Sequence, residues 1–315
     1  MFAEKIRVLR STGIRAGVKL ALRRAFRQRA KCYHHWRSLF VGKRALEIGG
    51  PSTLFEQRSP LPVYPILDEV DNCLFSASTV WLPETRQGKN FRYDAGRRRG
   101  YQYICDGTDL HEISAGQYGC VLSCNNLEHI ANPLKALTEW SRVLTDSGVM
   151  MVVVPAKDFT FDHRRSVATL AHLVRDWEHD VAEDDLSHLD EILSLHDLSR
   201  DLAAGDIDAF RERCERNNEN RCLHHHVFDA ELLASAMDFV GLQVCAVEAV
   251  LPYYWVAIAR KIRPDGASNK APFLDGMVGA GGYKRFRSGL GPSSQWETSR
   301  PSNAVCDDAA GSPKS

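Results

Sequence analysis

The feature that most constrains the fold is an unbroken apolar run, "VMMVVVP", over residues 149–155. A strand with one face in water alternates apolar and polar residues, whereas a run without alternation is typical of a parallel strand covered on both faces. The preceding segment predicts a helix over 132–148, because Asn132 can cap it and Pro133 suits its first position. We expect Gly148 to end this helix. A helix leading into a doubly covered strand indicates an α/β sheet.

Six further segments predict strands that alternate with helical patterns. They are residues 45–48, 63–70, 101–105, 118–124, 242–250 and 255–261. This order predicts a Rossmann-like, doubly wound α/β fold with a mostly parallel, seven-stranded sheet. Residues from about 156 to 222 break the rhythm, because they are rich in charge and histidine and have helical patterns. We expect them to form a helical insertion over the strand ends.

The flanking segments differ from this domain in composition. Residues 1–40 predict a basic helical extension, since thirteen Lys and Arg but only one acid, Glu4, occur up to Arg44. Its charged face either is solvated or contacts anionic lipid or an acidic partner. Residues 41–262 form the predicted α/β domain. Residues 263–315 are rich in Gly, Ser and Pro, which predicts a disordered tail.

Cysteine usage and hydropathy indicate the compartment. The nine cysteines are odd in number and form no C-x-x-C pair, which favours reduced thiols over a disulfide framework. No apolar stretch approaches the roughly 20 residues of a membrane helix. We therefore expect a cytoplasmic protein, either free or peripheral to a membrane through its basic N-terminus. The Arg-rich, acid-poor start also resembles an organellar transit peptide.

Polar residues and glycines follow four of the predicted strands. In strand order they are Glu47, Gly49 and Gly50, then Asp71, then Asp106 and Gly107, then Asn125 and Asn126. Ligands of open α/β sheets bind outside the carboxyl ends of the strands. One acid can hold ribose hydroxyls, a second can accept the adenine amine, and glycine lets the backbone approach a ligand closely. The combination indicates an adenosine-containing cofactor.

The loop after the first strand indicates which cofactor. The stretch "RALEIGGPSTLF" lacks the G-x-G-x-x-G spacing, because Pro51 and Ser52 follow the two glycines. Dinucleotide enzymes use that spacing to seat a pyrophosphate on a helix N-terminus. A ligand with adenosine and an amino-acid tail needs no phosphate cradle. The sequence therefore predicts S-adenosylmethionine rather than NAD.

Longer stretches carry a family resemblance. The segments "ALEIGGPS" and "CDGTDLHEISAGQYGCVLSCNNLEHIANPLKALTEWSRVLTDSGVMMVVVP" resemble class I S-adenosylmethionine-dependent methyltransferases, a broad family with many small-molecule enzymes. The resemblance covers about residues 40–262, and "KDFTFDHRRSVATLAHL", "EDDLSHLDEILSLHD" and "HHHVFD" resemble a bacterial subgroup. This chain has Asp146, Ser147 and Gly148 where the family usually has Pro-Gly-Gly. The resemblance implies a methyltransferase that uses S-adenosylmethionine.

The resemblance also implies roles for the residues at the strand ends. Glu47 would orient the methionine amino group, partly through water, above Gly49 and Gly50. Asp71 would hold the ribose. Asp106 and Gly107 would contact the adenine, and Asn125 and Asn126 would lie near the methionine portion. Pro51 and Ser52 replace later glycines of the family's loop, which alters the loop contacts but not the location of the site.

Three histidines are candidates for catalysis. Methyl transfer is a displacement that depends mainly on positioning, and a general base helps when the acceptor is a hydroxyl. We select His129, which either acts as the base or holds the turn at Asn132, together with His163 and His226. In a substrate-binding role, Arg164 and Arg165 either bind an anionic acceptor or form a salt bridge within the insertion. His225 is expected to close the acceptor pocket.

No metal site is predicted. The stretch "CLHHHVFD", with Cys214 and Cys222, invites a zinc interpretation. Adjacent histidines in an extended chain point to alternating sides, and no paired C-x-x-C accompanies them.

Three hypotheses for function follow. The first is a methyltransferase acting on an oxygen or nitrogen of a small-molecule or glycan-type acceptor. The alternative is a catalytically decayed methyltransferase fold that serves as a binding or scaffold protein and docks to a membrane or partner through its basic N-terminus. The missing phosphate fingerprint disfavours the third, an NAD-dependent oxidoreductase. Nucleic acid is not an expected partner, because no basic surface interleaved with aromatic residues occurs.

Overall fold

The computed structural model describes residues 29–82, 84–250 and 253–261, all within one compact unit, Met1–Asp275. Most of the predicted basic extension and all of the predicted tail lie outside the described residues. Within the described part of the extension, α3 (Lys31–Trp36) anchors the chain to the sheet. The backbone N–H groups of Lys31 and Cys32 donate to the Glu248 carboxylate, at 3.1 and 2.6 Å.

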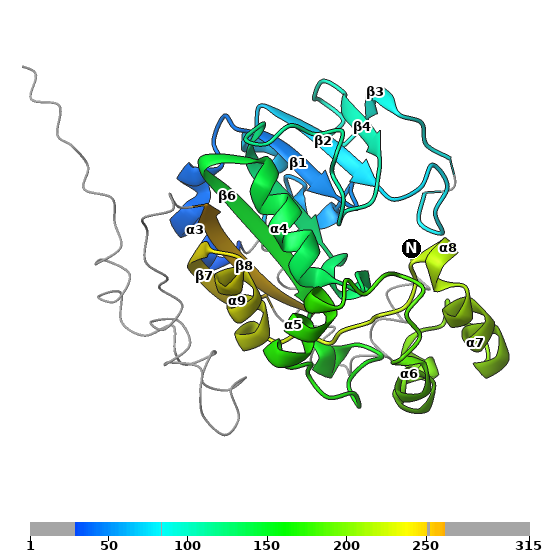
Figure 1. The fold of residues 1–315 in the computed structure, drawn as a ribbon. Coiled ribbons are helices and arrows are strands. Elements are labelled where there is room, and N and C mark those ends of the chain that lie inside the picture. The colour runs from blue at the N-terminus through cyan, green and yellow to red at the C-terminus, as the bar shows by residue number, and fades with distance from the viewer. Residues whose placement is uncertain (1–28, 83, 251–252, 262–315) are drawn as a thin grey trace, which may run out of the picture. The chain divides into compact units, whose positions relative to one another are not determined.

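The described residues form an eight-stranded sheet in the order β3-β4-β2-β1-β5-β6-β8-β7 (Figure 1). The strands are β1 (Arg44–Ile48), β2 (Glu69–Leu74), β3 (Gly88–Phe91), β4 (Gly100–Ile104), β5 (Tyr118–Cys124), β6 (Leu144–Pro155), β7 (Leu242–Val250) and β8 (Tyr254–Lys261). The five strands β4, β2, β1, β5 and β6 pair in parallel, and β3, β8 and β7 add antiparallel pairings. The predicted doubly wound fold is confirmed, with the short edge strand β3 added to the seven expected strands.

The run that led to this prediction is the centre of β6. Residues Val149–Val154 are all fully buried, with β5 on one side and β8 on the other. The helix before it, α4 (Pro133–Val143), begins as expected, because the Asn132 side chain accepts a hydrogen bond from the Lys135 N–H. It ends five residues earlier than predicted. Leu144 pairs with Tyr118 of β5, so strand pairing overrides the helical pattern there.

The second strand differs from its prediction. Residues 63–70 were expected to form it, but Tyr64–Ile66 is a 3-10 turn and β2 starts only at Glu69. Pro65 has no N–H to contribute to a strand ladder, which favours the turn. The shift moves the end of the strand to Leu74, with consequences for the site.

Helices cover the sheet and extend the molecule to one side. Helices α4, α5 (Leu170–Glu178) and α9 (Ala230–Phe239) pack against one another on one face (Figure 1). The region of the predicted insertion contains α5, α6 (Leu189–Leu195), α7 (Ile207–Glu215) and α8 (Asn217–Asn220). Figure 1 shows α6, α7 and α8 grouped beside the sheet rather than against its face.

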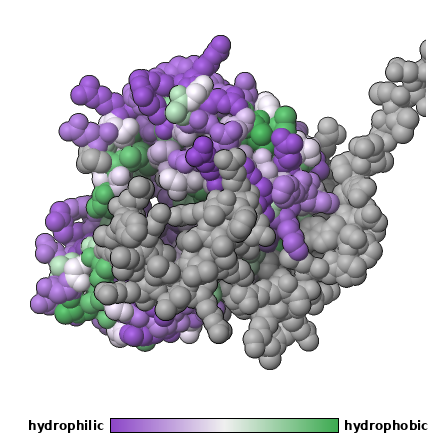
Figure 2. All heavy atoms as spheres, turned by 180° about the vertical axis from the view of Figure 1, so that it is seen from behind, coloured by the Kyte–Doolittle hydropathy of each residue, from purple (hydrophilic) through white to green (hydrophobic). Residues whose placement is uncertain are grey.

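The visible surface carries no extended apolar face among the described residues. Where described residues are visible in Figure 2, hydrophilic ones predominate and hydrophobic ones form small separate patches. Two of the exposed large side chains, Trp177 and Phe239, pack edge to face at 5.8 Å. Scattered exposed apolar residues of this kind are ordinary in folded proteins. No helix among the described residues has the length and apolar character needed to cross a membrane.

Candidate functional site

A cavity of about 400 Å³ opens at the carboxyl ends of the parallel strands. This is the edge of an open α/β sheet at which ligands bind. Four strand ends form its floor: Ile48–Gly50 after β1, Cys73–Phe75 after β2, Asp106 and Gly107 after β4, and Cys124–Asn126 after β5. Of the predicted cofactor-binding residues, Gly49, Gly50, Asp106, Gly107, Asn125 and Asn126 therefore line one cavity.

The turn after β1 presents bare backbone to this cavity. Gly49 has a φ of +82°, and a Cβ there would lie 2.7 Å from the Asn126 amide nitrogen. A Cβ on Gly50 would lie 2.2 Å from the Glu47 carboxylate. Neither position has room for a side chain, so the backbone stays open to a ligand. Such a cradle fits a cofactor that approaches the main chain closely.

Glu47 lies beneath this turn rather than in the cavity wall. Its side chain is fully buried, and the Tyr64 hydroxyl donates to its Oε2 at 2.6 Å. Burial raises the pKa of Glu47 to about 7. The turn is further held by Asn72, whose amide group both accepts from the Gly50 N–H and donates to the Gly50 carbonyl. Glu47 therefore supports Gly50, and direct contact with a ligand is not its observed role.

Asp106 presents its carboxylate at the end of β4. Its Oδ1 accepts from the Thr108 N–H and hydroxyl, both at 2.8 Å. Its Oδ2 accepts from Arg221 at 2.8 Å, and Arg221 also pairs with Glu183 at 2.9 Å. Arg221 and Glu183 both line the cavity and belong to the region of the insertion. Sequence reasoning missed them, because charged residues are frequent throughout that region.

Two polar groups in the segment after β5 lack hydrogen-bond partners among the described residues. Asn125 has a φ of +50°, and its N–H donates to the Val153 carbonyl, which bends the chain beneath the cavity. Among the described residues, Asn126 Oδ1 and His129 Nδ1 are buried without a hydrogen-bond partner. Burial lowers the pKa of His129 well below its ordinary value, so its ring is neutral near pH 7. The Trp81 ring meets it edge-on at 5.4 Å.

A second group of buried polar side chains, Glu128, His224 and Asp162, lies beside His129. Glu128 is 2% exposed, and neither of its carboxylate oxygens has a partner among the described residues. Burial raises its pKa to about 7. The His224 ring packs 4.4 Å from that of His129, and its Nδ1 bonds to Asp162 at 2.5 Å. Burial alone would lower the pKa of His224, but the Asp162 carboxylate outweighs burial, so the pKa of His224 is raised above its ordinary value.

The prediction for Asp71 is wrong. Because β2 continues to Leu74, Asp71 lies inside the strand and does not line the cavity. Its Oδ2 pairs with Arg44 at 2.5 Å and accepts from the Tyr118 hydroxyl at 2.7 Å. Its Oδ1 accepts from the Tyr101 N–H at 2.6 Å. The carboxylate is thus saturated inside the sheet, and Phe75 occupies the strand end that Asp71 was expected to hold.

The expected substrate and catalytic residues of the insertion also lie away from the cavity wall. His163 pairs with Asp197 at 2.9 Å, and Arg164 lies 3.6 Å from the same carboxylate. Arg165 is buried and donates to Asp162 and to the His224 carbonyl. These groups form salt bridges within the insertion, the second of the two roles considered for the arginines.

His225 and His226 also point into the insertion. His225 Nε2 lies 3.0 Å from the Asn217 amide and 3.3 Å from Glu183. His226 Nε2 bonds to Asp176 at 2.9 Å, and burial lowers the pKa of His226 to about 4. Among the three candidate bases, only His129 lines the cavity.

Comparisons with known proteins find methyltransferases over part of the chain. Residues 86–152 match the model of a family described as a methyltransferase domain. Similar solved structures include an S-adenosylmethionine-dependent methyltransferase from Methanosarcina mazei, at 11% identity and a TM-score of 0.41, covering 75% of this chain and 99% of that one. Another, from Mesorhizobium loti, has 11% identity, a TM-score of 0.39 and coverages of 73% and 98%.

An arsenic(III) S-adenosylmethionine methyltransferase from Chlamydomonas reinhardtii is also similar, at 11% identity and a TM-score of 0.39, with 73% of this chain and 66% of that chain covered. None of these likenesses is close enough to assign an acceptor. No curated protein matches the chain.

Proposed function

We propose that this chain, a class I S-adenosylmethionine-dependent methyltransferase, methylates an oxygen or nitrogen atom of a small-molecule or glycan-type acceptor and uses His129 as its base. The observation that carries the proposal is His129 in the wall of a cavity whose floor comes from four strand ends: its ring is neutral, and its Nδ1 has no hydrogen-bond partner among the described residues. When bound, S-adenosylmethionine supplies the methyl group.

Different residues at the strand ends hold different parts of the cofactor. The open backbone at Gly49 and Gly50 accommodates the amino-acid tail. It lies next to the side chain of Asn126, whose Oδ1 has no hydrogen-bond partner among the described residues. Asp106 retains acceptor capacity for the adenine amine, because a carboxylate has about four lone-pair sites. Arg221 and Glu183 close the cavity from the insertion and exclude water from the reacting groups.

The acceptor lies on the side of His129 and Trp81. A neutral imidazole can take a proton from a hydroxyl as the methyl group arrives, or from an ammonium group beforehand, which frees the nitrogen lone pair for attack. Trp81 is 56% exposed and lines the cavity, so its ring is available to stack on a sugar or another ring. A cavity of about 400 Å³ suits a compact acceptor beside the cofactor.

Calorimetric titration tests the cofactor half of the proposal. We expect the folded protein to bind S-adenosylmethionine and S-adenosylhomocysteine, and not NAD. If the folded protein binds neither S-adenosylmethionine nor S-adenosylhomocysteine, the proposed enzymatic function is contradicted and the scaffold alternative is favoured.

A methyl-transfer assay over a metabolite library tests the acceptor half. Once an acceptor is found, His129→Ala is expected to lower kcat about 10²-fold or more with little change in cofactor affinity, because a general base contributes 10²–10⁴-fold. His111→Ala, on the surface away from the cavity, is the control. Equal activity of both variants would remove His129 from the proposed role.

A further inference from the structure

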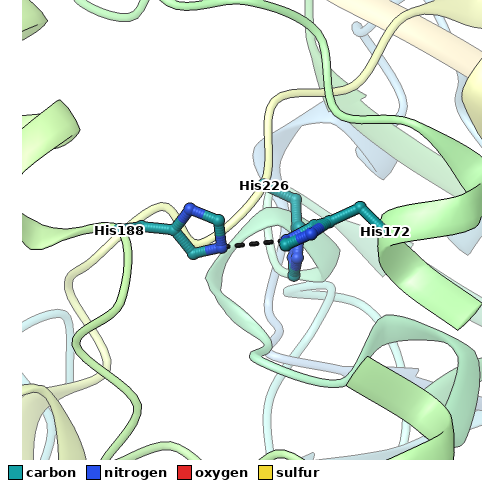
Figure 3. Close-up of side chains that lie close together, drawn as sticks. All are labelled: His172, His188 and His226. Atoms are coloured by element: carbon teal, nitrogen blue, oxygen red, sulfur yellow. Dashed lines mark hydrogen bonds between the residues drawn. The ribbon is translucent and has the colours of Figure 1, made fainter. Parts of the chain in front are cut away.

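Three histidines from separate segments meet outside the cofactor cavity. His172 comes from α5, His188 precedes α6, and His226 lies in the segment between α8 and α9 (Figure 3). One ring nitrogen from each lies within 4.8 Å of the others. The Nε2 atoms of His172 and His188 are 3.0 Å apart and face each other (Figure 3). None of the three lines the cavity.

The spacing of these nitrogens suits a tetrahedral metal ion. Zinc binds imidazole nitrogen at 2.0–2.1 Å, which places neighbouring ligand nitrogens roughly 3.3–3.4 Å apart. The 3.0 Å between the His172 and His188 nitrogens is close to that value, and the His226 nitrogen lies within 4.8 Å of both, so small side-chain rotations bring three nitrogens to one ion. Three histidines are a known zinc donor set, and imidazole also suits copper, iron and nickel.

A carboxylate and an unpartnered nitrogen add independent support. Asp176 Oδ2 lies 2.9 Å from His226 Nε2 and 3.4 Å from His172 Nε2. Metal-bound histidines commonly give their outer N–H to such a carboxylate, which fixes the ring. The other nitrogen of His226, Nδ1, is buried and has no hydrogen-bond partner among the described residues. His226 is 2% exposed, so this nitrogen has little access to bulk water.

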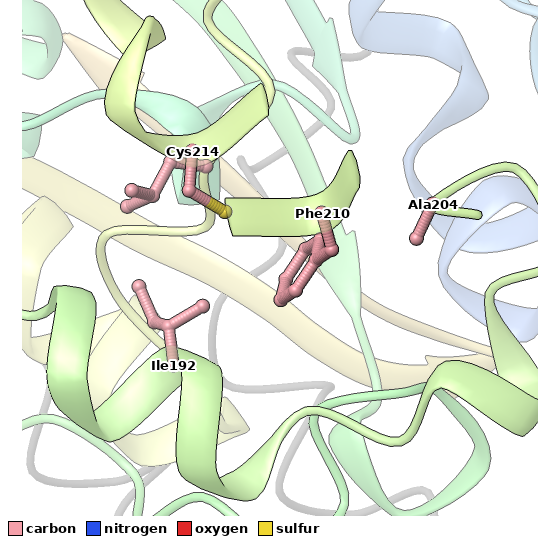
Figure 4. Packing of buried hydrophobic residues seen from close by; sticks show 5 residues of the cluster. Ile192, Ala204, Phe210 and Cys214 are labelled. Atoms are coloured by element: carbon pink, nitrogen blue, oxygen red, sulfur yellow. The ribbon is translucent and has the colours of Figure 1, made fainter. Parts of the chain in front are cut away.

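We propose that His172, His188 and His226 bind one zinc-class divalent metal ion, with Asp176 orienting the ring of His226. The ion joins α5, the start of α6 and the segment before α9, and so fixes the insertion. Arg175 now donates to His172 Nδ1 at 3.2 Å, and its exposed side chain turns to solvent when that nitrogen carries a proton. The sequence prediction of no metal considered the three adjacent histidines together with Cys214 and Cys222, and not His172 or His188. Cys214 packs in an apolar cluster (Figure 4), and two of the ligands are distant in sequence.

Metal content and cobalt substitution test the proposal on the full chain. After dialysis against a chelator, we expect the protein to bind one equivalent of Co²⁺ and to give the intense visible absorption of a tetrahedral site. Added Zn²⁺ should abolish that absorption and raise the midpoint of thermal unfolding, because the ion binds only the folded protein.

Variants locate the ion. His188→Ala and His226→Ala should lose the absorption, and Asp176→Asn should weaken binding about 10–100-fold. His179→Ala, at the end of the same helix as His172, is the matched control and should bind as the wild type does. His188 is partly exposed, so its variant keeps the test decisive even if His226→Ala fails to fold.

Two results would overturn the proposal. One is the absence of stoichiometric cobalt binding by the folded wild-type protein. The other is unchanged binding in His188→Ala together with its loss in Glu128→Gln, which would place the ion at the separate group of Glu128, His129 and His224.

Discussion

Asp71 lies inside β2 and Asp106 follows the neighbouring strand β4, and their carboxylates have different partners. Asp71 is fully buried and holds Arg44, Tyr118 and the Tyr101 N–H together inside the sheet. Asp106 is partly exposed at the end of β4 and borders the cavity. One carboxylate stabilises the strands, and the other is available to a ligand. Sequence alone could not separate these roles, because they depend on where β2 ends.

Substitutions should separate the two aspartates experimentally. Asp71→Asn is expected to lower the free energy of unfolding by about 1–3 kcal/mol, because the amide cannot accept at both oxygen positions. It should leave the Kd for S-adenosylmethionine unchanged. Asp106→Ala should raise that Kd about 10–100-fold through loss of a charged acceptor. Urea unfolding measures the first effect and calorimetry the second. A raised Kd for S-adenosylmethionine in Asp71→Asn would support the original prediction that Asp71 holds the ribose.

The buried Glu128 predicts a pH dependence of stability. Its folded pKa is about 7 and its ordinary value 4.5, so between these values the unfolded chain releases a proton that the folded protein keeps. Rising pH therefore destabilises the folded state over this window, by up to about 3 kcal/mol above pH 7. Glu128→Gln removes this cost. Its gain in unfolding free energy over wild type should grow from pH 4.5 to 7, and parallel pH profiles would contradict the assignment.

At the scale of elements, the insertion has a hydrophobic core of its own. Its buried members are Ile192, Ala204, Phe210, Cys214 and Leu223, from α6, α7 and the segments around them (Figure 4). This cluster is separate from the sheet, where the strands and α4 form the main core. A local core of this kind allows the insertion to open without unfolding the sheet.

Removal of the largest side chain of this cluster should therefore act locally. Phe210→Ala is expected to cost about 3 kcal/mol or more within the insertion, since it leaves a cavity. Hydrogen exchange should increase in α6 and α7 while the strands remain protected. Leu202→Ala, an exposed leucine in the same segment, should change neither. Uniformly faster exchange in the sheet would show that the insertion and the sheet unfold together.

Local sequence patterns predicted most elements and failed where distant pairing decided the outcome. The apolar run of β6 and the cap at Asn132 depend on neighbours in the chain, and both were recognisable. The end of α4 depends on pairing between Leu144 and Tyr118. The edge strand β3 has only four residues and one partner, so its pattern is too short to stand out.

At the scale of the whole molecule, one arginine connects the insertion to the cavity at the strand ends. Arg221 pairs with Asp106 and with Glu183, and its guanidinium lies 5.3 Å from the centre of the Phe75 ring. Three distant parts of the chain therefore meet at one side chain. The sequence predicted the cavity floor well because strand ends collect at one edge, whereas the closing residues require the folded path of the insertion.

Loss of this connection should speed ligand release. Arg221→Ala is expected to increase the dissociation rate of S-adenosylhomocysteine about tenfold, because the insertion loses its charged contact with the floor. Stopped-flow fluorescence can follow the release, since Trp81 lines the cavity. Arg216→Ala removes an exposed pair with Glu219 nearby and should not change the rate. Equal rates for both variants would mean that Arg221 does not retain the ligand.

The order in which the chain supplies the cavity has an evolutionary consequence. Ile48 to Asn126 build the floor, whereas Glu183, Arg221 and Tyr254 close it from later parts of the chain. Under the proposed function, mutations that reshape the later segments would alter which acceptor fits, and donor binding would persist only where Arg221 keeps its pairing with Asp106. Exchange of residues 156–220 between related chains, with Glu183 and Arg221 retained, would then be a route by which one floor acquires new acceptors.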